Sequence, residues 1–546
     1  MWKERSRGGR LRQVGYQSER RAYQSVRVAD RQACWISCWL CGYMTIVTSS
    51  AVPVHVVWFK RDLRVSDHRP LLDAAARGPV IPLYVYEPSL INQPTSDARH
   101  IAFSNECLAE LDTELRRLGA PLVYRHGDIV GVLNDLHRQH GISSLWAHQE
   151  TTDLAGYGRD KEVREWCAEQ GVAFVEHLDR GVFRRQKTRD GWSKRWRGLM
   201  TEAVAAAPER VRTVSIETQQ QRNAAELGLL PTGGDARQLG GRKRGLKVLD
   251  SFLSERAEPY ATAMSSPVSA FDHSSRLSPY LAFGTVSGRE VHQATLGRID
   301  EVKDMHDRGL WLKSLRAFDK RLHWRDHFTQ KLEDQPTLEV QAMHPMLEAI
   351  RSGEVDGERL EAFRDGRTGY PMVDACMRAT VATGWLNFRM RAMIVSFASY
   401  HLWLDWRPIA HYLATQWTDY EPGIHYPQHQ MQAGVTGINA LRIYSPTKQV
   451  HDHDPTGIFI RAWVPELESV PDEFIAEPSL MPLDIQTKTG FKVGHTYPLP
   501  IVDHQTATRA ARRIITDIKG TPEAKAISDT IVERHGSRRP RARRRS

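Results

Sequence analysis

The sequence has few cysteines, and their spacing does not form a disulfide framework. Three of the six lie close together near the N-terminus and three are isolated: Cys34, Cys38, Cys41, Cys107, Cys167 and Cys376. The N-terminal group lacks the second pair of ligands that a structural zinc site requires, so we expect no metal centre. Unpaired cysteines are typical of a reducing compartment, and we therefore expect a cytoplasmic protein.

Long apolar runs and one common glycine motif are also absent. The longest apolar stretches have the length of a strand or carry charges at helical spacing, so we expect no membrane span. No G-x-G-x-x-G follows the first strand-like run, Val54–Phe59. A nicotinamide dinucleotide site is therefore not indicated.

Acidic residues are scarce at both ends of the chain, whose net charge is +10. Residues 1–44 and 534–546 contribute +6 and +7, which leaves −3 for the residues between them. We interpret residues 1–50 as a disordered or non-native extension and residues 521–546 as a basic, disordered tail. Binding to nucleic acid must then come from a local basic patch on a nearly neutral body.

Strand-like and helix-like segments alternate through the first part of the chain. Runs rich in β-forming residues at 54–59, 80–86, 121–124, 144–147 and 172–177 are separated by stretches of helical periodicity. This alternation predicts βαβ units and a parallel sheet, that is, a Rossmann-like α/β domain over residues 51–179. From about residue 245 onward only helical periodicity remains. We predict an interdomain linker over 180–244 and a larger all-α domain over 245–520.

The densest group of motifs lies between Arg367 and Glu466. In order, they are RTGYPMVDACMR (367–378), GWLNFRMR (384–391), LDWR (404–407), DYEPGIHYPQH (419–429), RIYSPTKQ (442–449) and FIRAWVPE (459–466). They resemble the flavin-binding domain of the photolyase/cryptochrome family, and the resemblance extends over about residues 54–520. It is that of a divergent, bacterial-type deoxyribodipyrimidine photolyase.

The resemblance implies a cofactor, a chemistry and a substrate. We expect a helical domain that binds FAD and an enzyme, a carbon–carbon lyase, that uses blue light to split pyrimidine dimers in UV-damaged DNA. The run Trp58–Arg64 resembles the start of the family's N-terminal domain, which in relatives can hold a second, antenna chromophore. We expect a monomer without membrane partners.

Several residues are implied as ligands of the FAD phosphates and adenosine. Clustered hydroxyls at the start of a helix suit an anion, because the first N–H groups of a helix lack intrahelical partners. The run His273–Tyr280 resembles the family's phosphate clamp. The ligands expected from the resemblance are Tyr260, Ser274, Ser275, Leu277, Ser278 and Arg325.

A second set is expected around the flavin ring. Arg391 lies in an apolar helix, and a buried guanidinium requires a carboxylate, for which Asp419 is the family's usual partner. Glu421 stands where the family has an Asp that hydrogen-bonds the ring. His425 stands where relatives have an Asn beside flavin N5. A histidine there, near neutral pH, could change the protonation of the flavin.

The resemblance also assigns a lesion contact and an electron path. Trp324 is expected to stack on an extruded base, and Arg364, Arg367 and Lys448 to hold flanking phosphates. Trp406 matches one tryptophan of the family's electron-transfer chain. His429 replaces the tryptophan nearest the flavin, so the usual route is interrupted at its first step, with Trp385, Trp403 and Trp417 as substitutes.

Two further departures concern the lesion. Arg321 stands where photolyases that act on cyclobutane dimers have a Glu facing the dimer, and Phe388 replaces an Asn that contacts substrate or flavin. The alternative to repair is a cryptochrome-like blue-light photoreceptor without repair activity. A light-independent flavoprotein or DNA-binding module with the same fold is a third interpretation.

Overall fold

The computed structural model describes residues 52–186, 188–234 and 236–536. The expected N-terminal extension, the N-terminal cysteine group and the Arg-rich end of the expected tail lie outside these residues. These described residues form one compact unit.

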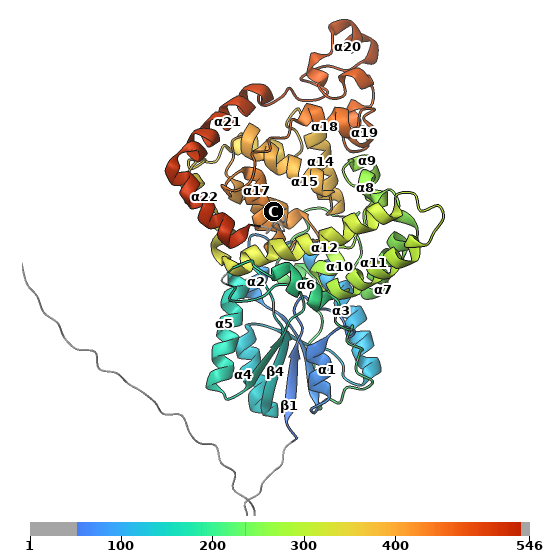
Figure 1. Cartoon of the computed structure of the whole chain (residues 1–546), viewed down its shortest axis with the longest axis vertical. Helices are drawn as coiled ribbons and strands as arrows, with labels where there is room; N and C mark the ends of the chain where they lie inside the picture. The colour runs from blue at the N-terminus through green and yellow to red at the C-terminus, as the bar shows by residue number, and fades with distance from the viewer. Residues whose placement is uncertain (1–51, 187, 235, 537–546) are drawn as a thin grey trace, which may run out of the picture. The chain divides into compact units, whose positions relative to one another are not determined.

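A five-stranded parallel sheet forms the first part of this unit, as the alternating pattern predicts (Figure 1). Its strands are β1 (Val54–Trp58), β2 (Val80–Tyr86), β3 (Val123–His126), β4 (Ile142–His148) and β5 (Ala173–His177), in the order β3-β2-β1-β4-β5. The order reverses between β1 and β4. In open α/β sheets this switch point is where ligands bind, outside the carboxyl ends of the strands.

The strands carry apolar side chains on both faces of the sheet, and helices therefore cover both faces. Val57 packs with α1 (Arg69–Ala75) and α3 (Ala98–Leu118), whereas its neighbour Val56 packs with α4 (Ile129–His140) and α5 (Leu154–Glu169). Helix α3 begins at the N-cap Asp97 and ends at Gly119, whose φ of 105° is left-handed. A short helix, α2 (Pro88–Ile91), follows β2.

The expected linker is anchored to the helical part. It contains α6 (Trp192–Met200) and the short η1 (Ala225–Leu227), and it ends where α7 begins at Arg242. Two tryptophans of α6 are buried, and the indole N–H of Trp196 donates to Asp326 of α12 at 2.8 Å. The long connection therefore has a fixed course.

The remaining described residues are helical, as expected. The helices are α7 (Arg242–Ser251), η2 (Phe252–Arg256), α8 (Tyr260–Ala263), α9 (Pro267–His273), α10 (Ser278–Ala282), α11 (Gly288–Lys303), α12 (Trp311–Asp334), η3 (Pro336–Glu339), η4 (Pro345–Leu347), α13 (Gly357–Arg364), α14 (Pro371–Thr383), α15 (Phe388–Ser396), η5 (Phe397–His401), α16 (Trp406–Gln416), α17 (Pro422–Ala433), α18 (Pro446–His453), α19 (Ile458–Trp463), η6 (Pro465–Leu467), η7 (Asp472–Phe474), η8 (Pro478–Leu480), α20 (Leu483–Thr489), α21 (His504–Gly520) and α22 (Pro522–His535). Helix α17 packs against α12, α15 and α16, and its Tyr426 and Ala433 lie in an apolar cluster with Tyr400 and Trp406.

The C-terminal region differs from the expectation in one respect. Residues 522–535, which we placed in a disordered tail, form α22. Ile531 of this helix packs against Leu332 and Met343, so the helix belongs to the folded unit. No helix among the described residues has the length and apolar character needed to cross a membrane.

Candidate cofactor site

An ion pair between α15 and the segment before α17 lies at the centre of the expected flavin site. Two guanidinium nitrogens of Arg391 donate to the two carboxylate oxygens of Asp419, at 2.9 and 3.0 Å. The Arg391 guanidinium also lies 4.3 Å from the centre of the Trp417 ring. Arg391 thus has the carboxylate partner that a buried guanidinium requires, in the bidentate geometry that arginine and carboxylate favour.

The segment 416–421, which carries Asp419, is fastened from outside the helical part. Arg99 and His100 of α3 donate to the backbone carbonyls of Gln416 and Trp417, the second at 3.0 Å. Arg61, which follows β1, donates to the carbonyl of Tyr420 at 2.9 Å. The position of Asp419 therefore depends on the α/β part of the fold.

Glu421 lies at the end of this segment between two arginines. It is buried and accepts from Arg180 of the linker and, at 2.8 Å, from Arg325 of α12. Arg325 also donates to the carbonyl of Leu281 at 2.9 Å. The structure thus brings Glu421 and Arg325 together, and their contacts with a flavin ring and a phosphate stay predictions. Arg180 was not foreseen, because its approach depends on the course of the linker.

The expected phosphate clamp forms a tight turn between α9 and α10. Ser274 ends α9, Leu277 is buried, and Ser278 begins α10. Arg256 holds the turn by donating to the carbonyl oxygens of Ser274, at 2.5 Å, and Ser275. Their hydroxyl roles toward a phosphate stay predictions.

Arg276 in this turn is a candidate that the sequence analysis missed. Its backbone is left-handed, with φ of 56°, and its guanidinium lies 4.2 Å from the Trp385 ring centre. Its Nε donates to the amide oxygen of Gln238 at 3.1 Å, and no described carboxylate forms an ion pair with it. Burial lowers the pKa of Arg276 to about 10. A half-buried cation with only a neutral partner favours an anionic ligand.

The residues present fit FAD on this observation. Arg391 is neutralised by Asp419, whereas Arg276 supplies an uncompensated positive charge beside the serine-rich turn. The buried amide oxygen of Asn387, the residue before α15, also has no protein partner. A diphosphate would meet the charge, and a hydrogen-bond donor of the cofactor would satisfy the amide oxygen.

The two expected flavin-side histidines of α17 pack against each other with their ring planes inclined by 39°. The ring centres of His425 and His429 are 4.0 Å apart, and both rings contact Trp417. His425 donates through Nε2 to the carbonyl of Ala410 at 2.8 Å, and His429 donates through Nδ1 to the carbonyl of His425 at 2.9 Å. Each ring therefore keeps one buried nitrogen as a free acceptor.

Burial decides the charge of this pair. Burial lowers the pKa of His425 well below its ordinary value, and the neighbouring His429 lowers it further. Burial also lowers the pKa of His429 to about 4. Both rings are therefore neutral near pH 7, and the expected influence of His425 on the protonation of the flavin stays a prediction.

The remaining expected residues lie around these helices. Trp406, the first residue of α16, is buried in an apolar cluster with Tyr400 and Tyr426, and its indole N–H has no protein partner. Tyr260, the first residue of α8, is buried against Phe252. Their roles in electron transfer and adenosine binding stay predictions.

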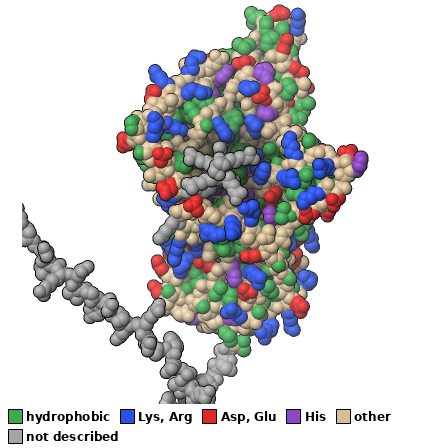
Figure 2. Space-filling view, viewed as in Figure 1, with side chains coloured by type: hydrophobic (Ala, Val, Ile, Leu, Met, Phe, Trp, Pro, Cys, Tyr) green, Lys and Arg blue, Asp and Glu red, His purple; other side chains and the backbone are tan. Residues whose placement is uncertain are grey.

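Trp324 differs from these because its side chain is half exposed, at 50%. It lies on α12 next to Arg325. In the space-filling view, Lys and Arg side chains lie along α12 (Figure 2). The exposed ring is thus accessible to a ligand from solvent.

A second candidate site is a cleft at the carboxyl ends of the strands. The cleft is open to solvent on one side. Residues after β1, β2 and β4 line it, together with Phe283 and Tyr420 of the helical part. It lies beside the switch point between β1 and β4, where the fold favours a ligand.

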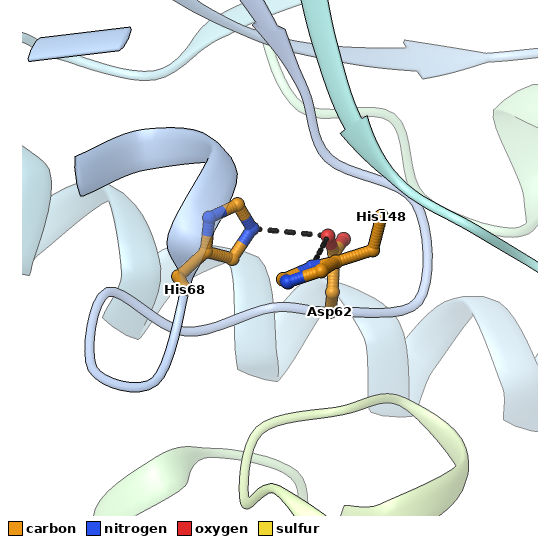
Figure 3. A group of neighbouring side chains, drawn as sticks. All are labelled: Asp62, His68 and His148. Atoms are coloured by element: carbon orange, nitrogen blue, oxygen red, sulfur yellow. Dashed lines mark hydrogen bonds and ion pairs between the residues drawn. The ribbon is translucent and has the colours of Figure 1, made fainter. Parts of the chain in front are cut away.

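A compact cluster of Asp62, His68 and His148 lies next to these strand ends (Figure 3). One carboxylate oxygen of Asp62 accepts from His68 Nε2 at 3.0 Å and from His148 Nδ1 at 2.8 Å. His68 Nδ1 accepts from the backbone N–H of Leu71 at 3.1 Å, so the neutral ring carries its proton on Nε2. That nitrogen cannot also bind a metal ion. The cluster is therefore a hydrogen-bonded cap for α1.

The chain matches two protein families. Residues 55–197 match the family described as DNA photolyase, and residues 318–517 match the FAD binding domain of DNA photolyase.

Similar curated proteins include both photolyases and cryptochromes. A deoxyribodipyrimidine photo-lyase of Agrobacterium fabrum is 30% identical over 488 residues, which cover 85% of this chain and 98% of that protein. Cryptochrome-2 of Arabidopsis thaliana is 28% identical over 500 residues, with 84% and 78% covered.

Solved structures give the same result. A bacterial class III photolyase from Agrobacterium tumefaciens has a TM-score of 0.75 and 28% identity, covering 87% of this chain and 100% of that chain. An archaeal photolyase from Sulfolobus tokodaii, solved with two FAD molecules, has a TM-score of 0.68 and 25% identity, with 85% and 100% covered.

Proposed function

Because this chain belongs to the photolyase/cryptochrome family and has its FAD-binding domain, we propose that it is a deoxyribodipyrimidine photolyase that repairs pyrimidine dimers in UV-damaged DNA under blue light. The observation that carries this proposal is the half-exposed Trp324, which directly precedes Arg325 on the helix that borders the cofactor site. An exposed indole there is a stacking surface for an extruded base, and base stacking on an aromatic ring is worth about 1–3 kcal/mol.

When bound by these residues, FAD would supply the light-driven redox chemistry of the reaction. The protein's own residues bind and orient. Arg391 and Asp419 form one wall of the site, and Arg276 with the Ser274–Ser278 turn meets the diphosphate. Trp324 receives the base and excludes water from its face.

Contacts to the DNA backbone are also part of the proposal. Arg367 and Lys448 are exposed, but each already forms an ion pair, with Asp365 at 2.6 Å and Asp452 at 2.9 Å. Exposed pairs of this kind are weak, so a phosphate can replace either carboxylate at little cost.

Blue-light repair by the purified protein tests the function. A thymine oligonucleotide with UV-induced dimers is illuminated under reducing conditions, and dimer loss and flavin absorbance are followed together. Repair that requires both light and bound FAD supports a photolyase, and a dark sample is the control. Persistence of both cyclobutane and (6-4) lesions while the flavin responds to light would contradict it.

A cryptochrome-like photoreceptor without repair activity is the second candidate. The observation that favours it is His429, a neutral, buried imidazole where relatives have a tryptophan next to the flavin. Imidazole carries an electron hole less readily than indole. This candidate predicts flavin photoreduction without dimer loss in the same assay.

We further propose that the α/β cleft holds a second, antenna chromophore. Its place at the switch point supports this, and so does Tyr420, which lines the cleft and directly follows Asp419 of the flavin site. Denaturing the purified protein and identifying every released chromophore tests it. Release of one FAD per chain and no other chromophore from protein purified from its natural host would contradict it.

A monomeric state and a cytoplasmic location complete the proposal. The three cysteines in the described ranges are buried and unpaired, which suits a reducing compartment. Light scattering of the purified protein gives the mass and hence the oligomeric state.

A further inference from the structure

Exposed aromatic residues are few in the described chain, and two of them meet on the surface above α12. The aromatic side chains among its exposed large hydrophobic residues are Tyr157, Trp324 and Phe388. Trp324 lies on α12, and Phe388, 46% exposed, is the first residue of α15. These are the helices that carry Arg325 and Arg391, so the two rings flank the cofactor site.

A single guanidinium lies between these two rings. The Arg321 guanidinium is 5.2 Å from the Trp324 ring centre and 5.8 Å from the Phe388 ring centre. Both distances are within the range of favourable cation–ring contacts. Trp324, Arg321 and Phe388 thus form one continuous surface, here called the aromatic clamp.

Arg321 resembles Arg276, and differs from Arg325 and Arg391, because no described carboxylate forms an ion pair with it. One terminal nitrogen donates weakly to the sulfur of Met264 at 3.8 Å, and the side chain also forms a hydrogen bond with the Tyr260 hydroxyl. Most of its five N–H donors therefore remain available to a ligand.

The chemistry of the clamp selects its ligand. Exposed ring faces bind flat, unsaturated or weakly polar groups, and a guanidinium donates hydrogen bonds but accepts none. A base that stacks on either ring brings its edge to Arg321, where carbonyl oxygens are favoured and amino groups are not. Thymine offers two such oxygens, O2 and O4, whereas cytosine offers one and an amino group.

We propose that Arg321, held between Trp324 and Phe388, is the residue that recognises the carbonyl edge of the extruded pyrimidine pair. This deepens the proposed function and rests on it, because the clamp acts only if a damaged pair enters the site. Arg321 is a specificity-determining contact, and the two rings fix its plane. A flanking phosphate offers the same acceptor chemistry, and the two sources differ in their dependence on salt.

Binding in the dark separates recognition from photochemistry. Fluorescence anisotropy measures the affinity of the FAD-containing protein for an oligonucleotide with one thymine dimer and for its undamaged copy, at several salt concentrations. The variants are Arg321→Gln, Arg321→Lys and Phe388→Leu. Arg316→Gln is the matched control, because Arg316 is exposed on the same helix and has no contact with the clamp.

We expect Arg321→Gln to lower the affinity for the dimer roughly tenfold while binding to undamaged DNA and the salt dependence stay as in the wild type. Arg321→Lys should lose as much, because an ammonium group cannot reproduce the planar fork between two rings. Phe388→Leu should reduce the preference for the dimer in part, and Arg316→Gln should leave it unchanged.

Other outcomes would overturn the assignment. An equal loss on both oligonucleotides, with a salt slope reduced by about one, would make Arg321 a phosphate contact. Full retention of the preference in Arg321→Gln would remove Arg321 from recognition while the proposed function stands. A wild-type protein without any preference for the dimer would remove both the clamp and the proposed repair function.

Discussion

At the scale of single residues, the site is organised by arginines that differ in how they are neutralised. Arg391 has a two-pronged carboxylate partner, Arg276 has a neutral amide, and Arg321 has two aromatic rings. A paired arginine shapes a wall, whereas an unpaired one attracts an anion or an acceptor. The same side chain therefore serves three tasks within one region of the fold.

Breaking the central pair should reduce cofactor binding. Asp419→Asn leaves the Arg391 guanidinium without its charge partner in a partly buried place, at a cost of about 3–5 kcal/mol. We expect a clear fall in the ratio of flavin to protein absorbance and a lower Tm. Glu466→Gln is the matched control, because Arg378 and Glu466 form a similar pair, with a 2.7 Å contact, outside the site. Equal flavin loss in both variants would show a general effect on folding.

His425 gives a prediction about pH. Because burial keeps the pKa of His425 well below its ordinary value, the ring stays neutral from pH 6 to 8. The rate of flavin photoreduction should therefore show no step in this range that disappears in His425→Asn. A step near pH 6.5 that the variant abolishes would mean that the cofactor restores the charged form.

Some of these residues could be predicted from the sequence and others could not. Burial of Arg391 in an apolar helix predicts a carboxylate partner, and the resemblance to the family implied that this partner is Asp419. The roles of Arg276 and Arg180 were not predicted, because they depend on a left-handed turn and on the course of a linker. Neither feature leaves a periodic trace in the sequence.

At the scale of elements, caps and turns decide where helices begin. The turn before α14 is held by the buried carboxylate of Asp374, which accepts from the backbone N–H and the hydroxyl of Thr368 at 2.9 and 2.6 Å. Tyr497, from the segment after α20, donates to the same carboxylate. Asp374 thus joins two segments that are distant in sequence.

Stability should depend on pH through Asp374. Burial raises the pKa of this carboxyl to about 6, although its hydrogen bonds oppose the shift. A raised pKa in the folded state means that its contribution to stability is fully present below about pH 4 and is lost as the pH rises to about 6. The loss amounts to up to about 3 kcal/mol. Denaturant titrations of wild type and Asp374→Asn should differ in slope over this range, and parallel curves would contradict the assignment.

Helix α22 was not predicted, because the charge pattern indicated a disordered tail. Thr521 accepts from the backbone N–H of Ala524 at 3.2 Å, Pro522 occupies the first turn and Glu523 follows it. These are start signals of a helix, and they were present in the sequence. The Arg-rich end that follows outweighed them in the interpretation. By contrast, the strands of the sheet were predictable because buried parallel strands are short, continuous apolar runs.

At the scale of the whole molecule, the α/β part and the helical part are joined by polar contacts that converge on residues 416–421. Arg99 is the most buried of these contacts: besides the carbonyl of Gln416 it reaches its side-chain oxygen at 3.0 Å, and it pairs with Asp97 at 3.1 Å. The parallel sheet and the helical domain were both predictable, but their junction was not, because it depends on single long side chains.

Removing the contacts of Arg99 should destabilise the cofactor site, although Arg99 does not itself belong to that site. Arg99→Met keeps much of the side-chain volume but removes the hydrogen bonds to Gln416 and leaves Asp97 without its partner. We expect a lower Tm and a reduced flavin content, and calorimetry should show the single transition broaden or split. Arg116→Met is the control, because Arg116 lies at the exposed end of the same helix. An unchanged flavin content in Arg99→Met would detach the junction from the cofactor site.

The fastening of residues 416–421 also bears on how the protein is made. The anchors, Arg61, Arg99, His100 and Arg180, leave the ribosome more than two hundred residues before the segment that they hold. Domains near the N-terminus generally fold first during synthesis. The α/β part can therefore fold before residues 416–421 are synthesised, and these residues then form the last wall of the flavin site against it. A fragment that starts at residue 245 would lack the α/β part.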